Sequence, residues 1–595
     1  MPSVPRLLLI LAALLTGLMG ATRPAVAQWP VGGVAIAPSP STQSAPLAIS
    51  DGRAPAAGGS GAIVVWGESR GTSGIDLYAQ RILGNGQVAS GWPAAGVALC
   101  AANGTQSTPA MVSDGAGGAI VAWRDFRSGG PTATDVYAQH VTAAGAIASG
   151  WPANGLAVCT AGGAQRAPGL APDGAGGAIA AWMDSRGGTA FADVYAQRFT
   201  GAGAIASGWS PDGNLVYAGN NEPAYPVALV SDGAGGAIGA WTYFGIGYYD
   251  VRAQRVDGAG NRRWGDLGVD IAAGYAFQYL PLAVSDGGAP TEGGSGALFV
   301  YQDNGASYPD DDICAQRLDS LGNPVPGWPS TSYGLPVCTA AGEQVSPVLI
   351  GDGAGGGFVS WKDSRAGAGS EDLYVQHLLG TGTHAAGWPG NGLAVCTAAG
   401  AQLSPALVRD AWDGAIVAWQ DGRGGGYDIY AVRIAGDGTV VPGWTAGGTA
   451  VCTADGDQTL PVAVTDGAGG AIVIWQDARN GGLNLYAQRV SAGGLVAPVA
   501  DVPSGPASPR LMLAARPNPA GRDLGAAFSL PDDSPATLEL LDVSGRRLLV
   551  RDVGTLGAGS HVLSLAEAGA LPAGIYLLRL TRGPASVTAR AAIVR

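Results

Sequence analysis

The sequence predicts an all-β protein in which an eight-bladed β-propeller precedes a small β-sandwich. The first observation is a repeat: the stretch Asp114–Trp123 occurs in eight copies, and its closing aromatic residue recurs every 56 to 60 residues, at positions 66, 123, 182, 241, 301, 361, 419 and 475. A fixed period of this size is the signature of a repeat architecture. Second, short apolar runs alternate with Gly, Asp and Pro and lack helical periodicity, which is typical of strands. Third, the repeat ends near residue 499, and a different strand pattern follows.

The chain starts with a segment that we interpret as a secretory signal peptide, residues 1–27. Arg6 precedes the apolar run Leu7–Met19, whose 13 residues are too few to span a bilayer. Ala25-Val-Ala27 has the small-x-small form of a cleavage site. No later segment of the sequence is long and apolar enough to cross a membrane. We therefore expect a mature chain that is secreted, either extracellular or held on the outer cell surface.

Each unit of the propeller, residues 28–499, is expected to form four antiparallel strands. In the unit that starts at Trp151, the strand-like runs are Leu156–Cys159, Pro168–Ala171, Ala178–Trp182 and Val194–Phe199. Turns rich in Gly and Asp separate these runs. Four short antiparallel strands in each of eight repeats are the pattern of β-propeller blades.

The two ends of the repeat region complement each other. Trp29–Ala37 is the strand that opens a unit, while the last unit has Ala471–Trp475 and Asn484–Arg489 but lacks such a strand after them. We predict that Gly33–Ala37 pairs in the sheet that holds Leu485–Val490. This pairing would close the ring and remove an exposed sheet edge.

The six cysteines are predicted to be free thiols, although export alone favours disulfides. Equivalent positions in neighbouring units lie about 10 Å apart, whereas a disulfide requires Cα atoms within about 7 Å. Five of the six occupy one repeat position, namely Cys100, Cys159, Cys338, Cys396 and Cys452.

A linker at residues 500–510 leads to a C-terminal segment, 511–595, with about seven strand-like runs. Its motifs Arg516-Pro-Asn-Pro519, Leu538–Leu548 and Leu571–Leu580 resemble the C-terminal sorting domain of the bacterial type IX (Por) secretion system. They equally resemble the immunoglobulin-like domain of flagellar hook capping proteins. The resemblance implies a small immunoglobulin-like β-sandwich, which follows the eight-bladed β-propeller that the repeat predicts in this all-β chain. It also implies export across an outer membrane, with the secretion machinery as a partner of this domain.

Composition and motifs exclude several classes of function. The net charge is −13 and no basic run exists, so binding to nucleic-acid phosphates is not expected. The sequence has no nucleophile elbow, no zinc-protease motif and no paired-cysteine metal spacing, so we assign no catalytic residue, no metal ligand and no cofactor. Asp and Arg recur in loops such as Asp125-Phe-Arg127. They are interpreted as ion-pair braces, with a repeated calcium site as the alternative.

The repeat breaks in its fourth and fifth units. There the Asp-x-Arg loop is replaced by Thr242–Tyr249, and aromatic residues accumulate up to position 308. Exposed aromatic side chains suit stacking on sugars or contact with a protein partner; the alternative is that they fill two diverged blades. The candidate ligand-binding residues are Tyr243, Phe244, Tyr248, Tyr249 and Tyr308.

These observations favour an exported, non-catalytic binding or scaffolding protein of the bacterial cell surface. The propeller would be the interaction platform for a protein or a glycan, and the C-terminal domain would serve secretion or anchoring. The alternative is an extracellular carbohydrate-active enzyme, a glycoside hydrolase or lyase, with carboxylic acids supplied by central loops.

Overall fold

The computed structural model describes residues 29–593 apart from 53–59, 72–73, 131–132, 189–191, 219–222, 246, 275, 288–294, 306–309, 331–332, 368, 497–510, 517–523, 531–533, 557–558 and 566–570. The predicted signal peptide, the predicted linker and Tyr308 therefore lie outside the described residues. Within the described part, we find no helix with the length and apolar character that a membrane crossing requires.

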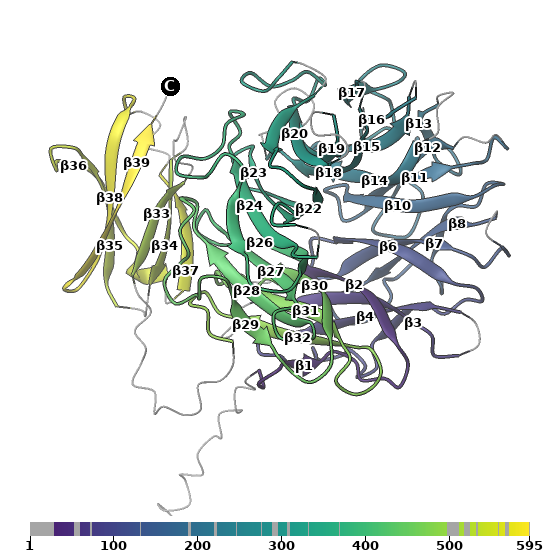
Figure 1. The fold of residues 1–595 in the computed structure, drawn as a ribbon, viewed down its shortest axis with the longest axis horizontal. Coiled ribbons are helices and arrows are strands. Elements are labelled where there is room, and N and C mark those ends of the chain that lie inside the picture. Colours follow the sequence, from purple (N-terminus) through teal and green to yellow (C-terminus); the bar gives the residue numbers. More distant parts are fainter. Residues whose placement is uncertain are drawn as a thin grey trace, which may run out of the picture.

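The described chain is all-β, with repeated four-stranded antiparallel sheets that fit a β-propeller (Figure 1). Unit one holds β2 (Gln43–Ser50), β3 (Ala62–Glu68), β4 (Asp76–Ile82) and β5 (Val97–Cys100). Unit two holds β6 (Gln106–Ser113), β7 (Ala119–Asp125), β8 (Asp135–Val141) and β9 (Leu156–Cys159). Unit three holds β10 (Gln165–Pro172), β11 (Ala178–Asp184), β12 (Asp193–Phe199) and β13 (Asn214–Tyr217). Unit four holds β14 (Pro223–Ser231), β15 (Ala237–Phe244), β16 (Tyr249–Val256) and β17 (Val269–Ala272).

The second half repeats this order. Unit five holds β18 (Gln278–Ser285), β19 (Ala297–Asp303), β20 (Asp312–Leu318) and β21 (Leu335–Cys338). Unit six holds β22 (Gln344–Gly351), β23 (Gly357–Asp363), β24 (Asp372–Leu378) and β25 (Leu393–Cys396). Unit seven holds β26 (Gln402–Arg409), β27 (Ala415–Asp421), β28 (Asp428–Ile434) and β29 (Thr449–Cys452). Unit eight holds β30 (Gln458–Thr465), β31 (Ala471–Asp477), β32 (Asn484–Val490) and, from the start of the chain, β1 (Val34–Ala35).

The second strand of each unit is the centre of its core. In β3, β15 and their equivalents nearly every side chain is buried, because both faces of the sheet pack against neighbouring sheets. Trp123, near the end of β7, is fully buried. Gly155 lies over its ring with φ +99°, and a Cβ there would come within 2.6 Å of the indole, so only glycine fits at this position.

In seven of the eight units the first strand starts at a buried glutamine, three residues earlier than the sequence pattern predicts; in unit four it starts at Pro223. In β10 the pairing register shifts between Arg166 and Gly169, and Ala167 has φ +42° just before Pro168. This β-bulge interrupts the strand and hides its first part from a sequence pattern. The first strands of successive units are neighbours, and β30 contacts β2, which completes a circle (Figure 1).

The predicted closure by the N-terminal strand is confirmed, over a shorter stretch than predicted. Val34 pairs with Ala487 and Ala35 with Tyr486, and the Ile36 amide donates a hydrogen bond of 2.9 Å to the Leu485 carbonyl. The prediction of free cysteines is also confirmed: all six are unpaired and buried. Burial raises the pKa of the Cys100 thiol to about 11.

The C-terminal segment forms two sheets that share one apolar core. One sheet holds β33 (Met512–Arg516), β34 (Gly525–Leu530) and β37 (Gly559–Ser564). The other holds β35 (Ala536–Asp542), β36 (Arg547–Asp552), β38 (Gly574–Arg582) and β39 (Ala585–Ile593), and η1 (Gly554–Leu556) is a single 3-10 turn. The core draws on both sheets, with Phe528 facing Leu538 and Leu578 within one cluster. The seven strands match the seven predicted runs.

Candidate functional site

Most units share a buried brace that joins the end of the second strand to its neighbours. In unit two, Trp123 Nε1 donates to Asp125 Oδ2 at 2.7 Å, and the Arg127 guanidinium donates to the same oxygen at 2.7 Å. Arg127 also donates to the Asn154 carbonyl at 2.8 Å and stacks 3.7 Å from the centre of the Tyr137 ring. The Asp-x-Arg loops are therefore ion-pair braces, as the sequence indicates. The arginine binds the carboxylate oxygens that a calcium ion would need as ligands.

Unit four keeps the charge pair but builds it from different positions. Tyr243 stands where the other units have an Asp or, in unit one, Glu68, and its hydroxyl donates to Asp270 at 3.2 Å. Arg252 stands at the position of Tyr137, the tyrosine on which the arginine stacks in unit two. It donates to Asp270 at 2.7 Å and lies 4.5 Å from the centre of the Tyr243 ring. The indole nitrogen of Trp241 is left without a hydrogen-bond partner among the described residues.

The expectation that Tyr243 belongs to an exposed binding face is therefore corrected. Only 6 % of Tyr243 is exposed, because it lies on a strand that is buried on both faces. Burial, together with the negative charge of Asp270, raises the pKa of its hydroxyl. Tyr243 is a core residue of unit four.

The remaining described candidates form a cluster with one residue that the sequence analysis did not single out. We call Phe244, Tyr248, Tyr249 and Phe277 the aromatic patch. Phe244 is 41 % exposed, and the other three are half-buried. The ring centres of Phe244 and Tyr249 are 5.2 Å apart, and Phe277 lies 5.5 Å from Tyr248 and 5.9 Å from Tyr249. The signal for Phe277 was its place in the aromatic-rich stretch of unit five.

Unit five has lost the brace. Asp303 keeps the carboxylate, but Gly305 stands in place of the arginine and Tyr301 in place of the tryptophan. Asp303 is 4 % exposed, and its Oδ1 accepts a hydrogen bond of 2.6 Å from the Gly305 amide. Burial raises the pKa of this carboxyl group. The Asp250 carboxyl of unit four accepts a hydrogen bond from the Gly274 amide, and burial also raises its pKa.

Two cavities lie away from this region. One, of about 350 Å³, is lined by the first strands and is mostly apolar, with Pro46, Pro109, Pro405 and Pro461 among its walls. No carboxylate lines it. The described residues also contain no group of three or more His, Cys, Asp or Glu side chains that could hold a metal ion.

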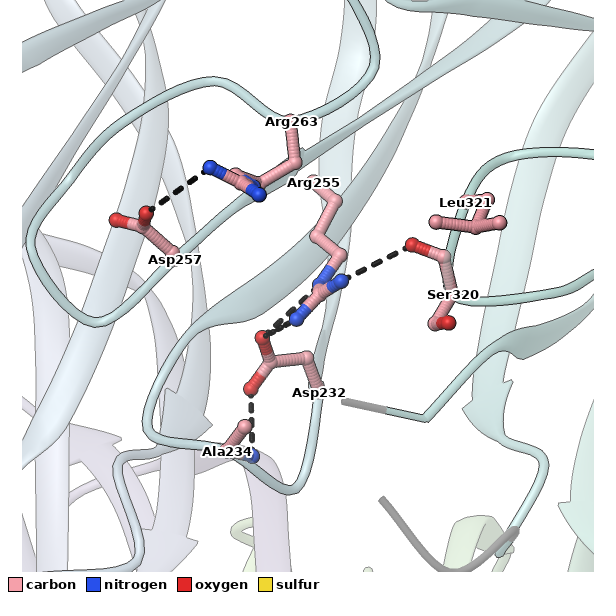
Figure 2. A pocket seen from close by; sticks show the side chains of 7 residues that line it. All are labelled: Asp232, Ala234, Arg255, Asp257, Arg263, Ser320 and Leu321. Atoms are coloured by element: carbon pink, nitrogen blue, oxygen red, sulfur yellow. Dashed lines mark hydrogen bonds and ion pairs between the residues drawn. The ribbon is translucent and has the colours of Figure 1, made fainter. Parts of the chain in front are cut away.

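The second cavity, of about 320 Å³, lies between the Asp232-Gly turn of unit four and the loop at Ser320 that follows β20 of unit five (Figure 2). Its Arg255 donates to Asp232 at 2.9 Å and to the Ser320 carbonyl at 3.0 Å, while Arg263 faces Asp257. The first pair recurs in every unit, with His140 or His377 in place of the arginine in two of them. Sequence analysis missed this second charge brace, although both partners lie in repeated motifs.

No known family model matches this chain, and no curated protein matches it. Among solved structures, a protein of unknown function from Dyadobacter fermentans is 11 % identical, covers 66 % of this chain and 96 % of its own, and has a TM-score of 0.34. A puromycin hydrolase is 14 % identical, with 71 % and 58 % coverage and a TM-score of 0.35. An α-L-arabinofuranosidase from Fusarium graminearum is 11 % identical, with 59 % and 93 % coverage and a TM-score of 0.27.

Two of these three structures are hydrolases by name. Their TM-scores are low, however, and the likeness carries no argument for either function in this chain.

Proposed function

We propose that this chain is an exported binding protein of the bacterial cell surface, in which an eight-bladed β-propeller, residues 28–499, presents a ligand-binding face. The C-terminal segment, residues 511–595, is proposed to be an immunoglobulin-like domain that serves secretion or anchoring through the secretion machinery. The ligand is a surface protein or a glycan, and it contacts the aromatic patch. No catalytic residue is assigned in this proposal.

The observation that carries this proposal is the aromatic patch itself. Four aromatic rings from two neighbouring units are in mutual contact and partly exposed. They lie where the repeated brace has been replaced in two successive units. Rigid aromatic groups of this kind supply large contact areas at a low cost in side-chain entropy, and such groups dominate the binding energy of many interfaces.

A binding screen of the mature chain against glycans and cell-surface proteins tests the proposal. We expect Tyr248→Ala combined with Tyr249→Ala to weaken binding of the identified ligand by at least about ten-fold, while the melting temperature stays within a few degrees. Tyr427→Ala is the matched control, because Tyr427 precedes Asp428 in unit seven as Tyr249 precedes Asp250. Equal losses of binding in the control and the double variant would refute the role of the patch.

A carbohydrate-active enzyme is the second candidate, and one observation favours it. Asp250 and Asp303 come from non-equivalent repeat positions of neighbouring units, and burial raises the pKa of both carboxyl groups. A carboxyl group that stays protonated is suited to general-acid catalysis. Release of reducing sugar from a polysaccharide panel that includes arabinan, lost in Asp303→Asn, would support the enzyme. No release by the wild-type protein from any of them would leave the binding role.

A further inference from the structure

Six units contain a preformed receptor for a guanidinium group, which we call the brace site. In unit six, Arg365 donates to Asp363 at 2.7 Å and to the Asn391 carbonyl at 2.9 Å, and it stacks 3.7 Å from the centre of the Tyr374 ring. The arginines that fill brace sites are Arg70, Arg127, Arg186, Arg365, Arg423 and Arg479. Their side chains remain 18 to 27 % exposed, so the site opens to solvent at one edge.

Unit five has the same site without its arginine and with less bulk around it. Relative to unit two, Trp becomes Tyr301, the stacking Tyr becomes Cys314, the Arg becomes Gly305, and the Cys of the preceding unit becomes Ala272. Each replacement is smaller than the residue it replaces. Unit four, in contrast, lost the loop arginine but restored the charge with Arg252. Unit five alone among the eight has no cation at this place within the described residues.

The carboxylate of the brace site is nevertheless retained in unit five. Within the described part of the chain, Asp303 Oδ2 and Tyr301 Oη have no hydrogen-bond partner, although the Gln278 side chain lies beside the Asp303 carboxyl. All three residues are more than nine-tenths buried. Buried polar atoms without a partner are rare in native proteins, since each costs the free energy of its lost hydration. Asp303 is thus a buried carboxylate that lacks the two donors of its equivalents, the tryptophan and the arginine.

The aromatic patch is tied to this site by hydrogen bonds. The Phe277 amide donates to the Asn304 side chain at 2.9 Å, and the Asn304 amide donates back to the Phe277 carbonyl. Asn304 lies between Asp303 and Gly305, so the patch loop and the empty brace site are held together. A cation that enters beside aromatic rings gains from their electron-rich faces.

We propose that the brace site of unit five binds the guanidinium group of an arginine side chain supplied by a partner protein. This inference rests on the proposed function, which places the binding face at the aromatic patch, and it adds that the partner presents an arginine beside that patch. The partner guanidinium takes the position that Arg127 or Arg365 takes within its own unit, and donates to Asp303 Oδ2. The planar fork of arginine, rather than the point charge of lysine, fits a carboxylate and a neighbouring carbonyl together.

Calorimetric titration of the mature chain with N-acetyl-arginine methylamide tests the site without a known partner. The neutral isostere N-acetyl-citrulline methylamide is the control ligand. We expect the arginine probe to bind at least about ten-fold more tightly than the citrulline probe, because only the arginine probe brings a charge to Asp303. Asp303→Asn should abolish this preference. Asp363→Asn, at the equivalent place in unit six, should leave it unchanged, since Arg365 still fills that site.

A second variant fills the site from within. Gly305→Arg restores the loop arginine. A Cβ at position 305 would lie 2.8 Å from the Ala276 Cβ and 2.8 Å from Asp303 Oδ1, so Ala276→Gly is combined with it and the Asp303 carboxyl has to shift. This double variant should lose the preference for the arginine probe and melt at a higher temperature than the wild type. Equal binding of the two probes to the wild type, or a preference that survives in Asp303→Asn, overturns the inference. If the probes show no preference while Tyr248→Ala, Tyr249→Ala still abolishes binding of the screened ligand, the inference fails and the proposed function stands.

Discussion

Equivalent carboxylates in this protein have pKa values shifted in opposite directions, because their donors differ. Asp421 of unit seven is buried, which opposes ionisation, but hydrogen bonds from Arg423 and Trp419 outweigh burial and lower its pKa. Asp303 at the same position has neither donor, so burial raises its pKa. An ionised aspartate at this position thus stabilises unit seven and destabilises unit five.

This difference predicts opposite effects of pH on two matched variants. The pKa of Asp421 is lowered in the folded state, so its contribution to stability is present above the unfolded value of about 3.9 and is lost as pH falls. Asp421→Asn should therefore lower the unfolding free energy by about 1–3 kcal/mol at pH 7, and by less in acid. The folded-state pKa of Asp303 is raised, so its contribution is present at low pH and lost as pH rises. Asp303→Asn should cost nothing at pH 7, and denaturant unfolding at pH 4 and pH 7 checks both signs.

Residue identity alone did not separate core from surface within the aromatic stretch. Tyr243 was predicted to bind a ligand because it lies where the repeat breaks. It stands, however, at the position of Asp125, on a strand that is buried in every unit. Aligning the units by strand rather than by composition places Tyr243 in the core and Phe244 at the exposed end of the strand. The importance of Asp303 could not be read from the sequence, since it depends on donors that are missing from two other positions, 301 and 305.

At the scale of elements, the repeat made the strands predictable but gave no sign of the β-bulges in the first strands. Strand two and strand three follow directly from their apolar pattern, and the pairing of the two chain ends follows from what each end lacks. The bulge in the first strand could not be predicted, because the register depends on the backbone at residues such as Ala167, whose positive φ precedes a proline. The hydrogen bonds of β1 reach only from Val34 to Ile36.

Closure by so short a strand predicts that its buried side chains carry the stability of the ring. Ile36 is 1 % exposed and Val31 is 83 % exposed. Ile36→Ala should destabilise the propeller by about 2–5 kcal/mol, whereas Val31→Ala should stay within about 0.5 kcal/mol of the wild type. Urea unfolding followed by tryptophan fluorescence compares them. Equal midpoints for both variants and the wild type would mean that the pairing of β1 with β32 contributes nothing to stability.

At the scale of the whole molecule, two sets of sheets have separate apolar cores. The clusters of the repeat region join neighbouring units, as between Trp361 and Val300 or between Trp475 and Trp419. The C-terminal cluster is made only of residues between 511 and 593. A set of sheets that buries its own apolar faces can fold without the rest of the chain. The sequence indicated this division by the loss of the repeat, while the packing of Phe528 against the second sheet required the structure.

The last prediction follows from these separate cores. Brief digestion of the mature chain with a protease of broad specificity should cut between residues 497 and 510 and leave two resistant fragments, identified by mass. Residues 511–595 expressed alone should give the dispersed amide spectrum of a folded domain, because every member of their core is present. Leu538→Ala, which removes a fully buried side chain from that core, should make the C-terminal fragment sensitive to the protease and leave the larger fragment resistant. Loss of both fragments in this variant would show that the two cores unfold together, and the division of the chain at this linker would be wrong.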